Sequence, residues 1–220
     1  MLEGISVPDL AIFFGVLLFS LSFHEFAHAW TALARGDPTA RDLGRVTLNP
    51  IRHLDLAMSL LVPAIFYLGS GGRVLFGGGK PVPVDPSRLR RRFDMVLVSA
   101  AGPASNVFLV LVGLALFGIL GRTIESGSTG WAILETWWQL NFWLALFNLL
   151  PIPPLDGSKI LGFFLPGSLG RSFDRLQHGP AGFLLLLAFL AVDGTGKLLV
   201  PVMVWTSGWV DRYLHLVGAL

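Results

Sequence analysis

The chain has no cysteine among its 220 residues. This absence excludes a disulfide scaffold, a metal site with thiolate ligands and a cysteine nucleophile. Charged residues are also scarce, at 14% of the sequence, whereas a soluble domain carries roughly 25%. Too little polar surface is available to cover a water-soluble globule. A soluble enzyme, a disordered chain and a coiled coil are therefore all disfavoured.

Apolar residues make up 53% of the chain, and several apolar blocks approach or exceed the roughly 20 residues that a helix needs to cross a bilayer. We predict an all-α polytopic membrane protein with about five to six hydrophobic helical segments. No internal repeat and no appended soluble domain is visible, so we expect one membrane domain over 1–220. Its core would span about 10–160, followed by C-terminal helical segments at about 176–217. The apolar blocks lie at 10–34, 54–69, 94–120, 131–150, 181–192 and 198–217.

Basic residues are absent before Arg35, and ten of the sixteen lie between Arg35 and Arg92. Positive charge collects on the cytoplasmic side of membrane proteins. We therefore expect a multi-pass protein of the plasma membrane, with its N-terminus outside and residues 35–53 in the cytoplasm. The basic residues are interpreted as topology signals, and we expect no nucleic-acid partner.

One motif inside the first apolar block carries chemistry: His24-Glu25-Phe26-Ala27-His28, an H-E-x-x-H pattern. Positions i and i+4 share one face of a helix, so both imidazoles can bind one zinc ion and the glutamate can act on water beside it. An ionisable residue within a membrane helix is costly, and this indicates a function. The alternative is a polar cluster that joins helices.

A catalytic zinc site needs a third protein ligand and an open position. Among the candidates Asp156 is favoured, because it follows a helix that the prolines after Asn148 interrupt. Irregular backbone at membrane depth is tolerated where it is buried or lines a wet cavity. A simple helix-ending turn explains the same residues equally well. The other candidate ligands are His53, His178, His215, Glu125 and Glu135.

Three motifs in order resemble the site-2 protease family, zinc metalloproteases that cut substrates within the membrane. They are His24-Glu25-x-x-His28, Gly102-Pro103-x-x-Asn106, and the segment from Asn148 through Pro151 to Asp156-Gly157. The match spans about residues 10–160. It is nearest to small prokaryotic members without a PDZ or CBS domain.

The resemblance implies one zinc ion per chain, bound by His24, His28 and Asp156, with Glu25 as the general base. It also implies that Asn106 is close to the active site, where its amide would bind the substrate backbone or the oxyanion. An interhelical hydrogen bond is the alternative for Asn106. Substrates in this family are transmembrane proteins or peptides, such as membrane-bound transcription factors, anti-sigma factors and leftover signal peptides.

The zinc site makes a demand on topology. If His28 and Asp156 bind one ion, the helices at 10–34 and 131–150 must run toward the same face. Block 94–120 then runs the opposite way, and block 54–69 cannot be a simple crossing. This block is short and contains a proline, so we predict that it is re-entrant. A partial crossing hidden in 70–86 is the competing interpretation.

The segment Lys80-Pro81-Val82-Pro83-Val84 is predicted to be extended, and its prolines restrict it to a sheet edge. The family uses a membrane-associated β element to hold substrate, so we predict substrate pairing through Lys80, Val82 and Val84. An ordinary linker is the alternative. For the whole protein, the alternative function is a membrane metal-ion transporter that uses the same His/Glu cluster. The sequence supplies candidate ligands for only one metal site, which argues against a transporter.

Overall fold

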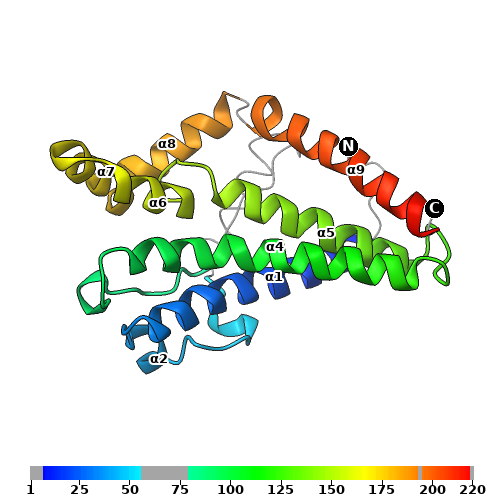
Figure 1. The fold of residues 1–220 in the computed structure, drawn as a ribbon, viewed down its shortest axis with the longest axis horizontal. Helices are drawn as coiled ribbons and strands as arrows, with labels where there is room; N and C mark the ends of the chain where they lie inside the picture. Colours follow the sequence, from blue (N-terminus) through cyan, green and yellow to red (C-terminus); the bar gives the residue numbers. More distant parts are fainter. Residues whose placement is uncertain (1–6, 56–78, 193–194, 219–220) are drawn as a thin grey trace.

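The computed structural model describes residues 7–55, 79–192 and 195–218, and every regular element in these ranges is helical. The predicted all-α class is therefore confirmed. Three long helices lie side by side along the molecule: α1 (Val7–Ala34), α4 (Asp94–Leu120) and α5 (Thr129–Asn148) (Figure 1). α4 packs against both of the others.

The side-chain contacts set the direction of each long helix. His24 and His28 of α1 meet Asn106 and Val98 of α4, so these two helices are antiparallel. Asn106 also meets Asn141 of α5, and Phe117 meets Trp131, so α4 and α5 are antiparallel as well. α1 and α5 consequently run the same way. The geometry meets the topological demand that a shared metal site makes.

The helices that follow α5 cap one end of the long helices and return along their side (Figure 1). α6 (Asp156–Phe164) packs on α4, and α7 (Gly167–His178) packs on α6 and α8 (Pro180–Ala191). A π-helical turn at Thr195–Leu199 leads into α9 (Val200–Val217), which contacts α4. The short elements described between α1 and α4 are α2 (Thr39–Asp42), η1 (Pro50–Arg52) and η3 (Pro86–Arg88).

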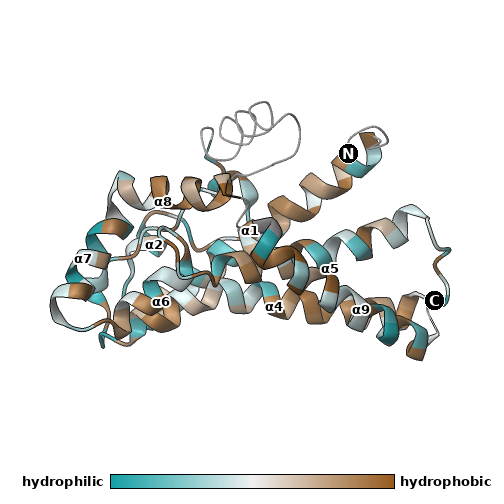
Figure 2. Ribbon diagram, turned by 90° about the horizontal axis from the view of Figure 1, so that it is seen from above, coloured by the Kyte–Doolittle hydropathy of each residue, from teal (hydrophilic) through white to brown (hydrophobic). Residues whose placement is uncertain are grey.

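Two of the described helices, α1 and α4, are long and apolar enough to cross a membrane, and α8 is a shorter apolar helix. α1 consists mostly of hydrophobic residues, whereas α7 is largely hydrophilic (Figure 2). The five to six predicted segments are not all tested by this finding. The predicted re-entrant block 54–69 lies almost entirely outside the described residues, as does most of the alternative crossing at 70–86.

Apolar side chains gather in two places away from the polar interior. One cluster joins α4, α5 and α9, and the other joins the end of α5 to α8 and the π-helical turn. The first contains Phe117, Trp131, Leu134, Trp138, Val210 and Leu214. This cluster fixes how α9 lies against the long helices.

Candidate metal centre

Helix α1 presents three polar side chains toward the interior. His24, Glu25 and His28 are each buried to more than nine-tenths, and the two imidazoles stand one helical turn apart. Their ring centroids are 4.6 Å apart, with the rings nearly perpendicular. The helix therefore aims both side chains at one point.

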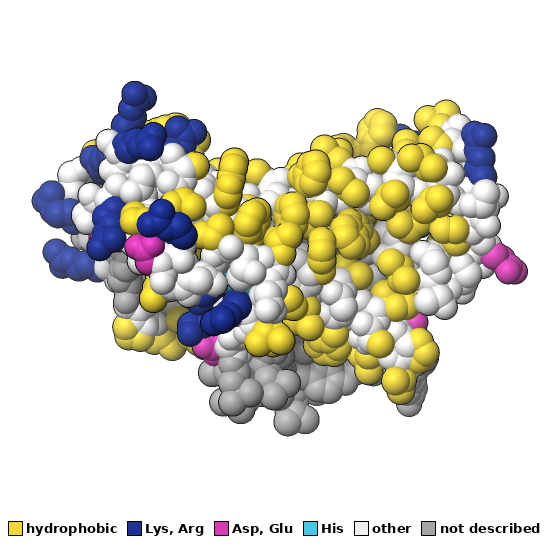
Figure 3. Space-filling model, turned by 90° about the horizontal axis from the view of Figure 1, so that it is seen from below, with side chains coloured by type: hydrophobic (Ala, Val, Ile, Leu, Met, Phe, Trp, Pro, Cys, Tyr) yellow, Lys and Arg dark blue, Asp and Glu magenta, His cyan; other side chains and the backbone are white. Residues whose placement is uncertain are grey.

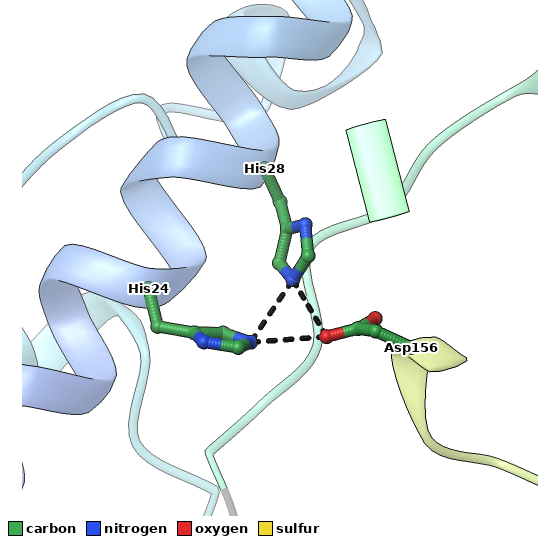
Figure 4. Close-up of side chains that lie close together, drawn as sticks. All are labelled: His24, His28 and Asp156. Carbon is green, nitrogen blue, oxygen red and sulfur yellow. Dashed lines mark hydrogen bonds and ion pairs between the residues drawn. The ribbon is translucent and has the colours of Figure 1, made fainter. Parts of the chain in front are cut away.

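Asp156 at the start of α6 reaches the same point from 132 residues away (Figure 4). Its Oδ2 lies 3.2 Å from His24 Nε2 and 3.1 Å from His28 Nε2, and the two Nε2 atoms are 3.0 Å apart. Within the described parts of the chain, these three residues form the one group of His, Cys, Asp and Glu side chains with the spacing of a metal site.

The outer ring nitrogens determine what faces this point. His28 Nδ1 lies 2.7 Å from the carbonyl oxygen of Val98, which can only accept, so the imidazole donates there. His24 Nδ1 lies 2.6 Å from Oδ1 of Asn106. A neutral imidazole that donates through Nδ1 carries a lone pair on Nε2. Two lone pairs and a carboxylate oxygen therefore converge.

Converging lone pairs repel one another unless a cation lies between them. Zinc fits this donor set, because catalytic zinc sites use three His or carboxylate ligands and leave a fourth position open. Bonds of about 2.0–2.1 Å in tetrahedral geometry place ligand atoms roughly 3.3 Å apart. The observed separations of 3.0–3.2 Å are close to that spacing.

Asn106 lies behind His24 and is part of a buried chain of hydrogen bonds. Its Nδ2 donates to Asn141 Oδ1 at 2.9 Å, and Asn141 Nδ2 donates to the carbonyl of Trp137. This chain fixes the Asn106 amide with its oxygen toward His24. The side chain of Asn106 is 0% exposed and both its polar atoms are occupied, so here it positions a ligand. Its predicted direct contact with substrate stays a prediction.

Gly102 of α4 gives the imidazoles their room. A Cβ at this position would collide with Nε2 of His28 and would stand 2.5 Å from Nε2 of His24. α4 continues through Pro103, and the glycine faces the metal centre itself.

Asp156 is held by its own helix. Lys159, one turn further along α6, donates from Nζ to Asp156 Oδ1 at 2.9 Å, which leaves Oδ2 directed at the histidines. Gly157 lets α6 begin against the end of α5, because a Cβ there would collide with the carbonyl of Leu149. These contacts turn a proline-rich corner into a defined ligand position.

Glu25 meets the predicted β element. The backbone N–H of Val82 donates to Glu25 Oε2 at 2.8 Å. The chain at 80–84 forms no regular element, and no strand pairing occurs in the described ranges, so the β element is not confirmed. The physical reason is local: Pro81 and Pro83 have no N–H, and the Val82 N–H is bound to Glu25.

Backbone and side-chain groups from earlier in the sequence fix both ends of this segment. Lys80 donates its N–H to the carbonyl of His53 at 2.7 Å, and its own carbonyl accepts from the buried Arg45 at 2.6 Å. The N–H of Asp85 donates to the buried Asp37. Hydrogen bonds from Ser87 lower the pKa of the Asp85 carboxyl.

The other candidate ligands whose side chains the structure describes do not join the metal centre. His53 is buried, and its Nε2 bonds the carbonyl of Thr47. Glu135 accepts from Gln139 on the surface of α5. His215 lies in the last turn of α9, and Glu125 lies between α4 and α5. His178 is the last residue of α7.

Comparison with known proteins places this centre in a family. A model of peptidase family M50 matches residues 120–190. The chain is 36% identical to "Putative zinc metalloprotease YwhC" of Bacillus subtilis (strain 168), over 97% of this chain and 93% of the relative. It is 29% identical to "Putative zinc metalloprotease Rip2" of Mycolicibacterium smegmatis, over 92% of this chain and 75% of the relative. "Putative zinc metalloprotease Rip2" of Mycobacterium tuberculosis (strain H37Rv) is 36% identical over 79% of this chain and 64% of the relative.

The chain belongs to peptidase family M50. The resemblance to site-2 proteases is therefore confirmed, and the chain is a metallopeptidase with a centre that fits zinc. No solved structure gives a significant match.

Several residues of this M50 peptidase that act at the centre were not found from the sequence. Lys159 stands three residues after Asp156, a spacing that becomes informative only once a helix is known to start there. Asn141 is one of several polar residues in α5, together with Glu135 and Gln139, and its complete burial appears only in the structure. Arg45 and the carbonyl of Val98 carry no signal in sequence.

Proposed function

We propose that this M50 peptidase is a zinc-dependent endopeptidase that cleaves transmembrane segments of membrane proteins. The observation that carries the proposal is the convergence of three ligand atoms on the inner face of α1, a helix apolar and long enough to cross a bilayer. A site at that depth reaches peptide bonds that a soluble protease cannot reach. His24, His28 and Asp156 are the proposed zinc ligands.

A bound zinc ion supplies a Lewis acid that makes water nucleophilic near neutral pH and polarises a carbonyl. Glu25 is the proposed general base: it accepts a proton from the attacking water and donates it to the leaving amine. The N–H of Val82 fixes the direction of the Glu25 carboxylate. Asn106 holds His24 in the tautomer that turns Nε2 inward.

Peptide hydrolysis needs an unwound substrate, because a helix encloses its own carbonyl groups. We propose that substrate lies extended beside the segment that includes Lys80, Val82 and Val84, in the manner of strand addition. The Val82 N–H is bound to Glu25 in the described structure, so pairing at that residue requires the bond to open. Both backbone groups of Lys80 are bound as well, its N–H to His53 and its carbonyl to Arg45, so pairing at Lys80 requires those bonds to open.

For the whole chain we propose a single membrane domain over 1–220 in the plasma membrane, with the N-terminus outside and the site opening toward the cytoplasm. Lys and Arg side chains gather at the α7 end of the molecule, and a broad apolar surface covers the middle (Figure 3). This division supports the orientation, since basic residues favour the cytoplasmic side. Substrates are proposed to be single-span regulatory proteins or signal-peptide remnants.

The first test is zinc content. Purified wild type should hold about one zinc ion per chain, and Asp156→Ala should hold much less, because two histidines alone rarely retain zinc through purification. Glu25→Gln should keep the zinc and lose cleavage of a single-span model substrate by about 100-fold or more. Equal zinc in wild type and Asp156→Ala would remove Asp156 as a ligand.

The transporter alternative is not favoured. The described residues contain one group of metal-binding side chains rather than a series along a path. Zinc flux into vesicles carrying wild-type protein, without peptide cleavage, would reverse this preference.

A further inference from the structure

A cavity of about 810 Å³ opens beside the metal centre. Four parts of the chain line it: the proline segment at Pro81 and Pro86, the start of α4, helix α6 and helix α7. Pockets of about 300–1,000 Å³ hold drug-sized ligands, so this space suits a few residues of peptide.

The walls of the cavity lead directly to the metal centre. Lys159 lines the cavity and donates to the ligand Asp156. Pro81 lines it and immediately precedes Val82, whose N–H holds Glu25. Met95 lines it one helical turn before Val98, whose carbonyl holds His28. A chain bound at the metal centre would therefore continue into this cavity.

The charges on the walls are unequal. Three basic side chains, Arg92, Lys159 and Arg171, line the cavity together with one acid, Asp174. The Arg92 guanidinium lies 5.4 Å from the ring centre of Phe163, also in the wall, and this contact holds it at the cavity. Lys159 has three N–H donors and the structure gives one to Asp156, so it retains capacity for a second acceptor.

We propose that this cavity binds the part of the peptide substrate that flanks the scissile bond, and that Arg92, Lys159 and Arg171 select substrates with Asp or Glu side chains there. The inference rests on the proposed protease function and adds a specificity to it. Favourable pairing of carboxylates with partly exposed cations is the physical basis, and its strength falls with salt.

Binding can be measured separately from cleavage. The probes are fluorescent peptides with one apolar span flanked by four Glu, four Gln or four Lys residues, in two series with the flank before or after the span. Fluorescence polarisation with the zinc-loaded Glu25→Gln variant in detergent gives each Kd. In one series we expect Glu to bind about fivefold more tightly than Gln, and Lys most weakly, with the differences reduced at high salt.

Charge reversal locates the preference. Arg171→Glu on α7 should reduce or reverse the order, whereas Arg41→Glu on α2 should leave it unchanged. Arg41 is a matched control because it makes the same change in net charge and is paired outside the cavity with Asp42. An order that Arg171→Glu leaves intact, or the absence of binding by any peptide, would overturn the inference.

Two further outcomes separate the competing explanations. If Arg171→Glu lowers phosphatidylglycerol binding in native mass spectrometry and leaves the peptide order intact, the cavity holds a lipid headgroup and the inference is wrong. Wild-type cleavage of the same peptides tests the proposed function by itself. A charge preference in binding without any cleavage would overturn the protease function alone, and cleavage without a charge preference would overturn the inference alone.

Discussion

Helices α4 and α5 pack against each other with different chemistry at their two ends. Near the metal centre, Asn106 and Asn141 meet through a hydrogen bond of 2.9 Å, and His24 continues the chain. Toward the other end, the rings of Phe117 and Trp131 pack edge to face within an apolar cluster, with their centroids 4.8 Å apart. The hydrogen bond fixes the orientation of individual atoms, whereas the aromatic contact fixes only how closely the two helices fit together.

In a membrane protein, directional contacts rather than apolar packing set the precise positions of atoms. Lipid is as apolar as a leucine side chain, so apolar packing gives close fit with little directional preference. Buried hydrogen bonds fix orientation, because an unpaired polar atom in an apolar interior is costly. Zinc affinity should therefore respond to changes at the polar end and remain insensitive to changes at the apolar end.

The largest expected loss of zinc comes from Gly102→Ala. The added methyl group would occupy the space of both imidazole Nε2 atoms, so zinc affinity should fall by more than about 100-fold, which exceeds the loss on removing a hydrogen-bond partner of a ligand. Competition with a zinc chelator measures the affinity. Gly15→Ala on α1 is the matched control, since nothing lies within 4 Å of its Cβ position. Full zinc affinity in Gly102→Ala would mean that the imidazoles do not face this glycine.

A smaller loss is expected from Asn106→Ala, which removes the acceptor for His24 Nδ1–H. Loss of such an orienting partner typically lowers metal affinity by about 10- to 100-fold. Asn141→Ala keeps that acceptor and removes only its support, so it should cost less. The same chelator competition ranks the two variants, and an equal or reversed ranking would contradict the order of the chain.

Lys159→Met should weaken zinc binding by about fivefold to tenfold, because Asp156 loses the donor that turns Oδ2 toward the histidines. Methionine keeps most of the apolar stem, and Lys159→Arg keeps a donor as the control. Isothermal titration with zinc measures both variants. Wild-type affinity in Lys159→Met would show that α6 positions Asp156 unaided.

Phe117→Ala tests the other side of the comparison. It should leave zinc affinity unchanged and lower the stability by on the order of 3 kcal/mol, because it empties the centre of the apolar cluster. Thermal unfolding in detergent, with zinc content measured in parallel, checks both parts. A loss of zinc at temperatures where the fold remains intact would mean that the two ends are coupled.

How far the sequence predicts the fold depends on the kind of boundary. The bounds of α4 are those of the predicted block 94–120, because three arginines precede the apolar run and Gly121 follows it. Helices α6 and α7 were not distinguished within the Pro- and Gly-rich segment at 151–175. Both are short, and α6 depends on Gly157 fitting against α5.

The same division holds for the metal centre. The donor types and the helical face shared by His24 and His28 follow from the sequence alone, because residues at i and i+4 share one face of any helix. Resemblance to a family then pointed to Asp156. The distances of 3.1–3.2 Å from Asp156 Oδ2 to both Nε2 atoms come from the tertiary structure alone. The same is true of the contacts that hold the three proposed ligands and Glu25, which are made by Asn106, Val98, Lys159 and Val82. These contacts join residues up to 132 positions apart, and the packing of α1, α4 and α6 sets their distances.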